Sequence, residues 1–170
     1  MNRANKYLLD ANVFIEAHKN YYAFDLCPGF WECLIEYHNN DMLFSIDRVK
    51  KEMEDNKDNL SEWIKTSIPP THFVSTNSQS VIKWYGQMQT WANQQPQFND
   101  EAKAEFANNA DCWLVAYAKA NSYVLVTHEV FNPKIKRKIP IPNVCQEFGV
   151  DYINTFNMLR GLGIRLILER

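Results

Sequence analysis

The 170-residue sequence has little of what several kinds of functional site require. It has only five glycines and no glycine-rich loop of the kind that cradles phosphates. Its four cysteines form no C-x-x-C pair and no cysteine–histidine cluster with zinc spacing, which argues against a soft-metal site. Free thiols in a reducing compartment are the simpler interpretation. No serine, histidine and aspartate set typical of a hydrolase stands out either.

A strong charge excess and a long apolar run are also missing. The net charge of −2 argues against a strongly cationic nucleic-acid coat, but it leaves room for a local basic groove. No apolar stretch approaches the roughly 20 residues that a membrane helix needs. Charges at Arg3, Lys6 and Asp10 interrupt the region where a signal peptide would have its apolar stretch. We therefore expect a soluble, cytoplasmic protein with no membrane contact.

The apolar pattern predicts an α/β fold. With 46% hydrophobic residues, the chain can form one domain, expected to span 1–170, with a sizeable core. Strands are predicted at 6–10, 42–46, 72–75, 123–128, 151–153 and 164–168. Helices are predicted at 28–39, 48–56, 80–93, 101–107, 109–120 and 155–160. This alternation favours three α/β/α layers around a mostly parallel sheet.

Local signals mark the predicted helix starts and one unusual segment. Asp47 is expected to cap 48–56, Asn99 or Asp100 to cap 101–107, and Asn154 to cap 155–160. Residues 77–108 are polar but carry several aromatic side chains, and we expect a helical excursion from the sheet that serves as a lid, a clamp or a dimer surface. Its tryptophans and tyrosine can stack bases, but helix packing or an oligomer contact is the favoured interpretation.

The most informative position is Asp10, which follows the apolar residues Leu8 and Leu9 directly. In open α/β sheets, ligands sit at the carboxyl ends of the strands, where this carboxylate is predicted to lie. An ionisable group between Leu9 and the apolar residues Val13 and Phe14 is unfavourable to bury without a partner. Asp10 is therefore a candidate functional residue.

Three further carboxylates occur in comparable contexts: Glu52, Asp111 and Glu129. Each alone has an ordinary explanation, since Asp111 suits a helix N-terminus, Glu52 a solvated helix face and Glu129 a loop. Their joint occurrence is harder to explain in that way. Crowded carboxylates raise one another's pKa, and a hard divalent cation such as Mg²⁺ reverses this unfavourable effect. A metal pair that activates water suits phosphodiester hydrolysis.

These residues resemble the motifs of the PIN domain, a family of metal-dependent nucleases. Its pattern opens with strand–Asp–x–Asn, here Leu9-Asp10-Ala11-Asn12, and continues with a glutamate after the second strand, here Glu52. An aspartate among small apolar residues follows, here Asp111, and a strand–Thr–x–acid motif closes the set, here Thr127-His128-Glu129. In this sequence, Glu129 replaces the commoner aspartate and His128 the usual asparagine.

The resemblance implies a three-layer α/β/α fold with Mg²⁺ or Mn²⁺ at an acidic rim and endoribonuclease activity on RNA. It implies that Asp10 and Asp111 bind the metal directly, that Glu52 binds it or a water on it, and that Glu129 binds it directly or from a second shell. Asn12 and Thr127 would orient carboxylates or bind substrate phosphate, and a local turn bond is an equally good explanation for Asn12. Small stand-alone members are often toxins paired with an antitoxin protein and are commonly homodimers.

One dense basic run follows the last acidic motif and contains Lys134, Lys136, Arg137 and Lys138. It is predicted to lie near the carboxylates, where it would contact RNA phosphates, or else to be a solvated loop that balances nearby acids.

Two other function classes compete with the ribonuclease hypothesis. The chain can be a non-catalytic PIN-like scaffold that binds RNA or a partner protein. An aspartyl phosphotransferase with Asp10 as nucleophile ranks lower, because Asn12 stands where such enzymes usually carry a second acid.

Overall fold

The computed structural model describes residues 5–168 and has a parallel β-sheet at its centre. The strand order is β3-β2-β1-β4-β5, and each neighbouring pair is parallel. The strands are β1 (Tyr7–Leu9), β2 (Leu43–Ile46), β3 (Phe73–Val74), β4 (Val124–Val126) and β5 (Tyr152–Ile153). The predicted α/β class with a parallel sheet is therefore confirmed.

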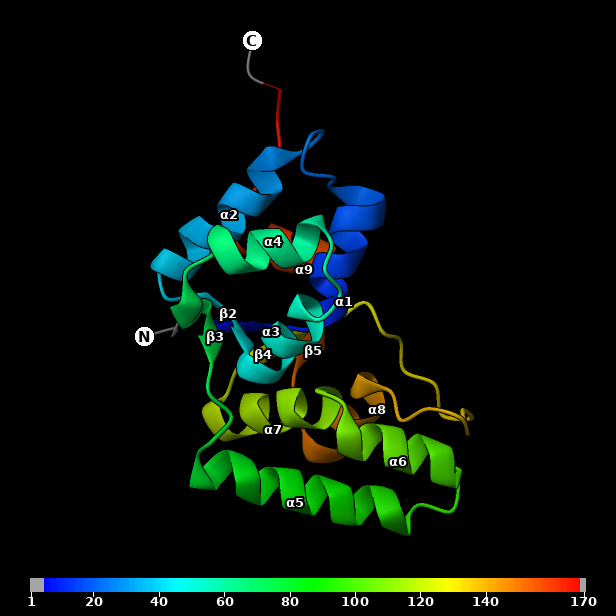
Figure 1. Cartoon of the computed structure of the whole chain (residues 1–170). Helices are drawn as coiled ribbons and strands as arrows, with labels where there is room; N and C mark the ends of the chain where they lie inside the picture. Colours follow the sequence, from blue (N-terminus) through cyan, green and yellow to red (C-terminus); the bar gives the residue numbers. More distant parts are fainter. Residues whose placement is uncertain (1–4, 169–170) are drawn as a thin grey trace.

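Helices cover both faces of this sheet, which gives the expected three layers (Figure 1). On one face lie α1 (Ala11–Glu16), α2 (Pro28–Asn39), α4 (Asn59–Thr66) and α9 (Thr155–Gly161). On the other lie α5 (Gln79–Gln94), α6 (Asp100–Asn108), α7 (Asp111–Asn121) and α8 (Ile141–Phe148). Helix α3 (Asp47–Glu54) packs against β2, β3 and α4, and a π-helix, η1 (Ala17–Tyr21), continues α1. No helix within residues 5–168 combines the length and apolarity that crossing a membrane requires.

The two central strands β1 and β2 are buried at every residue. All three residues of β1 are buried, as strands covered on both faces require. Leu8 of β1 lies opposite Phe44 of β2 and Leu125 of β4. The buried Ser45 of β2 donates a 2.7 Å hydrogen bond to the backbone oxygen of Leu9. This bond fixes the end of β1, the point at which Asp10 leaves the sheet.

The segment 77–108 is helical, as predicted, and it belongs to one helical layer of the fold. Helix α5 packs along α7 and buries Val81 and Met88. Tyr85 stacks on Trp113 with ring centres 3.8 Å apart, and Trp91 packs edge-on against Phe148 at 5.8 Å. Helix packing is therefore the role that the structure gives these rings.

Two local predictions are wrong. Residues 164–168 form no strand, because no other strand of the described chain pairs with them, and Ile167 and Leu168 are 73% and 84% exposed. Asp47 is not the cap of α3 but its first residue. Its carboxylate instead accepts hydrogen bonds from the backbone and hydroxyl of Thr76, at 3.1 and 2.9 Å, and so joins α3 to the segment after β3.

Other helix signals are confirmed, and three α-helices of the described residues were not predicted. Asn99 and Asn154 cap α6 and α9 through their side-chain oxygens. The unpredicted helices are α1, α4 and α8. Sequence signals exist for α4 and α8: Asp58 caps α4, and α8 ends at Gly149, whose φ of 63° is the left-handed value that glycine adopts readily.

A histidine lies in the core between β2 and the neighbouring helices. His72 is fully buried, with its ring 6.0 Å from Phe14 and 5.2 Å from His38. Burial, reinforced by the nearby His38, lowers the pKa of His72 to about 3. The folded protein therefore contains the neutral imidazole.

We expect His72→Leu to reduce the acid sensitivity of the fold. Below about pH 6.5 the unfolded chain binds a proton at this histidine, whereas the folded chain does not. The wild-type free energy of unfolding should therefore fall by up to about 1.4 kcal/mol per pH unit between about pH 6 and pH 4. Urea denaturation over this range should show a shallower decline for the variant, and parallel curves for the two proteins would contradict the assignment.

Candidate functional site

Asp10 lies where the sequence places it, at the carboxyl edge of the sheet, between β1 and α1. The residue is only 5% exposed. Its backbone N–H donates to the Val126 carbonyl at 3.0 Å, which ties the end of β1 to the end of β4. Its Oδ2 accepts a 2.9 Å hydrogen bond from the hydroxyl of Thr127. The position of this carboxylate is thus set by two adjacent strands.

Thr127 is the centre of the hydrogen-bond network around Asp10. Its hydroxyl donates to Asp10 and accepts from the Asn12 amide at 3.2 Å and from the Glu129 backbone N–H at 3.1 Å. One donor and two acceptor positions are therefore all in use. Asn12 in turn accepts from the His128 backbone N–H at 3.1 Å. Asn12 is thus engaged with the segment after β4 and makes no local cap of α1.

Glu52 and Asp111 approach this edge from α3 and α7. The Oε1 of Glu52 accepts a 3.0 Å hydrogen bond from the backbone N–H of Ala110, the residue before Asp111. Two hydrogen bonds join Asp111 and Asn109. The backbone N–H of Asp111 donates to Asn109 Oδ1 at 3.1 Å, and the side-chain amide of Asn109 donates to Asp111 Oδ2 at 3.2 Å. The two acids are thereby fixed at neighbouring positions, although they are far apart in the sequence.

Glu129 is held differently from the other acids. One carboxylate oxygen pairs with the ammonium of Lys138, and the other accepts a 2.8 Å hydrogen bond from the backbone N–H of Ile141. Lys138 is thereby separated from Lys134, Lys136 and Arg137, which are exposed. The loop that carries these three is anchored where Gln97 and Asn99 donate to the Ile135 and Lys136 carbonyls, at 2.7 and 2.9 Å.

The electrostatics show that the four acids, here called the acidic cluster (Asp10, Glu52, Asp111 and Glu129), act on one another. Burial and then the charge of Glu129 raise the pKa of Asp10 to about 7. Burial and then the charge of Asp10 raise the pKa of Asp111 to about 8, and Glu129 and Glu52 add to this effect. Burial also raises the pKa of Glu52, while the Ala110 N–H opposes the change.

Lys138 is the cation that partly compensates this charge. Burial alone would lower its pKa, but its bond to Glu129 and the proximity of Asp111 and Asp10 raise the pKa instead. The ammonium therefore remains protonated at neutral pH, and it lowers the pKa of both Asp10 and Asp111.

The donor chemistry of the acidic cluster fits a hard divalent ion bound by two carboxylates. Among the residues that the structure describes, Asp10 and Asp111 each keep one oxygen free of side-chain hydrogen bonds, and Mg²⁺ in proteins commonly relies on one or two carboxylates. Both oxygens of Glu129 are already engaged. Across residues 5–168, no three or more histidine, cysteine, aspartate or glutamate side chains are grouped so that they could hold a metal ion together.

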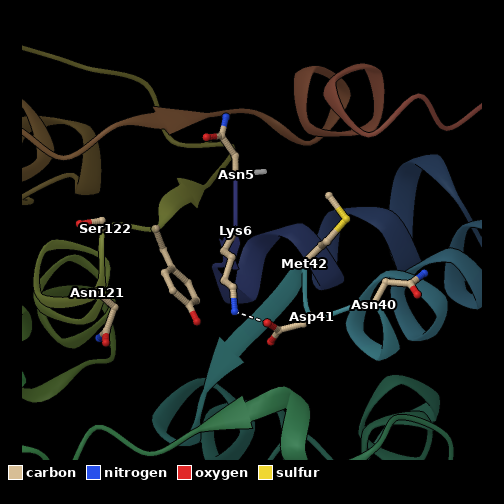
Figure 2. A pocket seen from close by; sticks show the side chains of 8 residues that line it. Asn5, Lys6, Asn40, Asp41, Met42, Asn121 and Ser122 are labelled. Atoms are coloured by element: carbon tan, nitrogen blue, oxygen red, sulfur yellow. Dashed lines mark hydrogen bonds and ion pairs between the residues drawn. The ribbon is translucent and has the colours of Figure 1, made fainter. Parts of the chain in front are cut away.

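A separate cavity of about 810 Å³ lies at the opposite edge of the sheet (Figure 2). Lys6, Met42 and Tyr123, which precede β1, β2 and β4, line it. Figure 2 shows the Lys6 ammonium directed at the Asp41 carboxylate. The amino ends of parallel strands are not where α/β folds usually bind ligands, so this cavity is distinct from the candidate site.

Comparison with known proteins adds a family and a fold. The model of one family, described as a domain of unknown function (DUF4411), matches residues 7–166. The chain belongs to the DUF4411 family. No curated protein matches this DUF4411 chain.

Two solved structures resemble it over nearly their whole length. One is FitAcB from Neisseria gonorrhoeae, with a TM-score of 0.57 and 17% identity over 88% of this chain and 98% of that one. The other is VapBC2 from Rickettsia felis bound to a DNA fragment from their promoter, with a TM-score of 0.53 and 14% identity over 87% of this chain and 97% of that one. The PIN-like fold that the motifs predicted is confirmed.

The sequence singled out the four acids and the threonine, but it missed the groups that fix their side chains in the structure. Asn109, the Ala110 N–H and the Ile141 N–H carry no sequence motif of their own. The separate place of Lys138 had one available signal, since Ile139 and Pro140 directly after it begin a buried stretch. A lysine that adjoins a buried segment is less free to remain in solvent than the other residues of the basic run.

We expect Asp10→Asn to stabilise the metal-free protein at alkaline pH. The folded pKa values of Asp10 and Asp111 lie above the ordinary value of 3.8, so the folded chain binds more protons and loses stability as the pH rises from about 4 to about 8. Each pKa unit corresponds to about 1.4 kcal/mol. Urea denaturation in EDTA should show a shallower decline from about pH 5 to pH 9 for the variant, and an unchanged decline would contradict this electrostatic account.

We expect Thr127→Val to weaken the fold and to raise the pKa of Asp10 further. The isosteric variant loses the donor to Asp10 and leaves the Asn12 amide and Glu129 N–H without their acceptor, at a loss of about 1–3 kcal/mol in unfolding free energy. Thr127→Ser keeps the hydroxyl and is the matched control. Urea denaturation and an NMR titration of the aspartates measure both effects, and equal behaviour of the two variants would refute the role of the hydroxyl.

Proposed function

We propose that this DUF4411 chain is a Mg²⁺- or Mn²⁺-dependent endoribonuclease that hydrolyses RNA phosphodiester bonds at the acidic cluster. The observation that carries the proposal is the burial of Asp10 and Asp111 near Glu129: burial first, and then the neighbouring charges, raise their pKa values to about 7 and about 8. Such an arrangement is unfavourable in the absence of a cation. It lies at the carboxyl edge of a parallel sheet, where α/β proteins bind ligands.

In this proposal, Asp10 and Asp111 hold the divalent ion, and Glu52 assists from its fixed place beside Ala110. A bound ion of this kind acts as a Lewis acid on the phosphodiester and lowers the pKa of water. Thr127 keeps one Asp10 oxygen turned away, so that the other faces the ligand. Asn12 holds Thr127 and the segment after β4 in register. Glu129 acts indirectly, because it holds Lys138.

The basic residues have two different roles. Lys138 is close enough to Asp10 and Asp111 to alter their pKa values, so its ammonium can neutralise charge on the phosphoryl oxygens of a bound substrate. Lys134, Lys136 and Arg137 are exposed on the loop that begins beyond Glu129, and they suit contacts to phosphates farther along the RNA.

We also propose a biological setting from the resemblance to small PIN-domain proteins. The chain would act as a single domain and as the toxin of a toxin–antitoxin pair, with an antitoxin protein as partner and with a homodimer as its own assembly. The likeness to FitAcB and VapBC2 in fold supports this setting.

One observation favours a second candidate, a non-catalytic scaffold that binds RNA or a partner protein. Lys138 already pairs with Glu129 within the acidic cluster, so part of its charge is compensated without a metal. Calorimetric titration with Mn²⁺ separates the two functions: a nuclease site should release heat that Asp111→Asn abolishes, and a scaffold should not.

We expect Asp111→Asn to abolish Mn²⁺-dependent RNA cleavage while the protein stays folded. Loss of a direct ligand should lower the rate by more than about 100-fold, the upper range for groups that merely support metal ligands. The exposed Asp25→Asn is the control and should cleave like the wild type. Cleavage of a labelled single-stranded RNA, with circular dichroism to verify folding, measures both. Undiminished cleavage by Asp111→Asn would refute the assignment.

A further inference from the structure

We propose that Tyr21 and His128 form a stacking platform for one RNA base next to the phosphodiester bound at the acidic cluster. The inference rests on the proposed function, since it requires RNA at the carboxylates. It adds a binding subsite that the sequence motifs do not contain.

Three aromatic rings from separate elements meet beside the acidic cluster. The rings of Tyr21 and His128 lie nearly parallel, with centres 5.9 Å apart and an interplanar angle of 26°. Phe156 of α9 packs edge-on against Tyr21 at 5.3 Å and also contacts His128 at 5.8 Å. His128 stands between Thr127 and Glu129 in the chain, so the rings are attached to the segment that carries two residues of the site.

The imidazole of the platform is held rigidly. The backbone N–H of His128 donates to Asn12 at 3.1 Å, and its ring Nε2 lies 2.8 Å from the hydroxyl of the buried Thr155. A ring that is fixed in place loses little conformational entropy when a base stacks on the platform.

Tyr21 supplies the open part of the platform. It is the last residue of the π-helix η1, a rare conformation that occurs frequently at functional sites. The residue is 52% exposed, and its hydroxyl makes no hydrogen bond with the described residues, so the ring packs on His128 and Phe156 while part of it stays open to a ligand. By contrast, Tyr22 is largely covered by its stack on Phe30 at 4.4 Å.

A base is the ligand that this geometry favours. A phosphodiester at Asp10 carries a nucleoside on each side, and the platform begins one residue from Thr127, which holds Asp10. A flat aromatic face without hydrogen-bond donors binds any base by stacking, so we expect little sequence preference at this subsite. The exposed cations Lys134, Lys136 and Arg137 follow Glu129 along the chain and would contact the backbone of the same strand.

The test uses the full chain with two variants of one residue. Tyr21→Phe keeps the ring and Tyr21→Leu keeps only apolar bulk. Binding of a short fluorescein-labelled single-stranded RNA is measured in EDTA, and cleavage of the same RNA is measured in Mn²⁺. We expect Tyr21→Leu to weaken binding and raise KM about 5- to 150-fold, the equivalent of ~1–3 kcal/mol per stacked base, with little change in kcat. Tyr21→Phe should behave like the wild type.

An RNA of the same length that carries abasic sites separates stacking from other contacts. The wild type should bind it as weakly as Tyr21→Leu binds normal RNA, and Tyr21→Leu should show no further loss. Equal binding of normal RNA by Tyr21→Leu and the wild type, or no binding of RNA by the wild type, would overturn the platform. If RNA is cleaved but Tyr21→Leu has no effect, the platform is wrong and the proposed function stands. If Tyr21-dependent binding occurs without cleavage, the proposed function is wrong and the platform stands.

Discussion

The burial of the Asp10 carboxylate at the end of β1 is the constraint on which the rest of the site depends. A carboxylate that is only 5% exposed is unfavourable unless neighbouring groups stabilise it. Within residues 5–168, the hydroxyl of Thr127 supplies the one side-chain hydrogen bond that Asp10 accepts, and it can do so only because β4 lies beside β1. The position of the Asp10 carboxylate therefore depends on the strand order, which places β4 beside β1.

The charge gathered around Asp10 explains the course of the chain after β4. Burial and the charge of Glu129 raise the energy of the ionised Asp10, and the nearby Lys138 lowers it. The loop after Glu129 folds back onto this residue, and the Lys138 ammonium and the Ile141 N–H bind its two carboxylate oxygens. Helix α8 thus begins at the acidic cluster, and the exposed basic residues lie on the part of the loop farther from it.

Local sequence signals predicted much of the fold because they act over a few residues. Apolar runs located β1 and β2, and the side chains of Asn99 and Asn154 capped the helices that follow them. The signals failed where a distant partner decides. An apolar run such as 164–168 becomes a strand only if another strand lies beside it, and Asp47 caps no helix because Thr76 binds its carboxylate instead.

The sequence by itself determined which residues are available for chemistry: four acids in the order of the PIN motifs, the threonine before the last of them and a basic run after it. Tertiary structure alone decided that Lys138 leaves this run to pair with Glu129, that Glu52 accepts from the Ala110 N–H, and that the ring of Tyr21 lies on His128. The physical reason is range. Apolar periodicity and capping involve neighbours in the chain, whereas ion pairs and ring stacks depend on distances that only the assembled layers set.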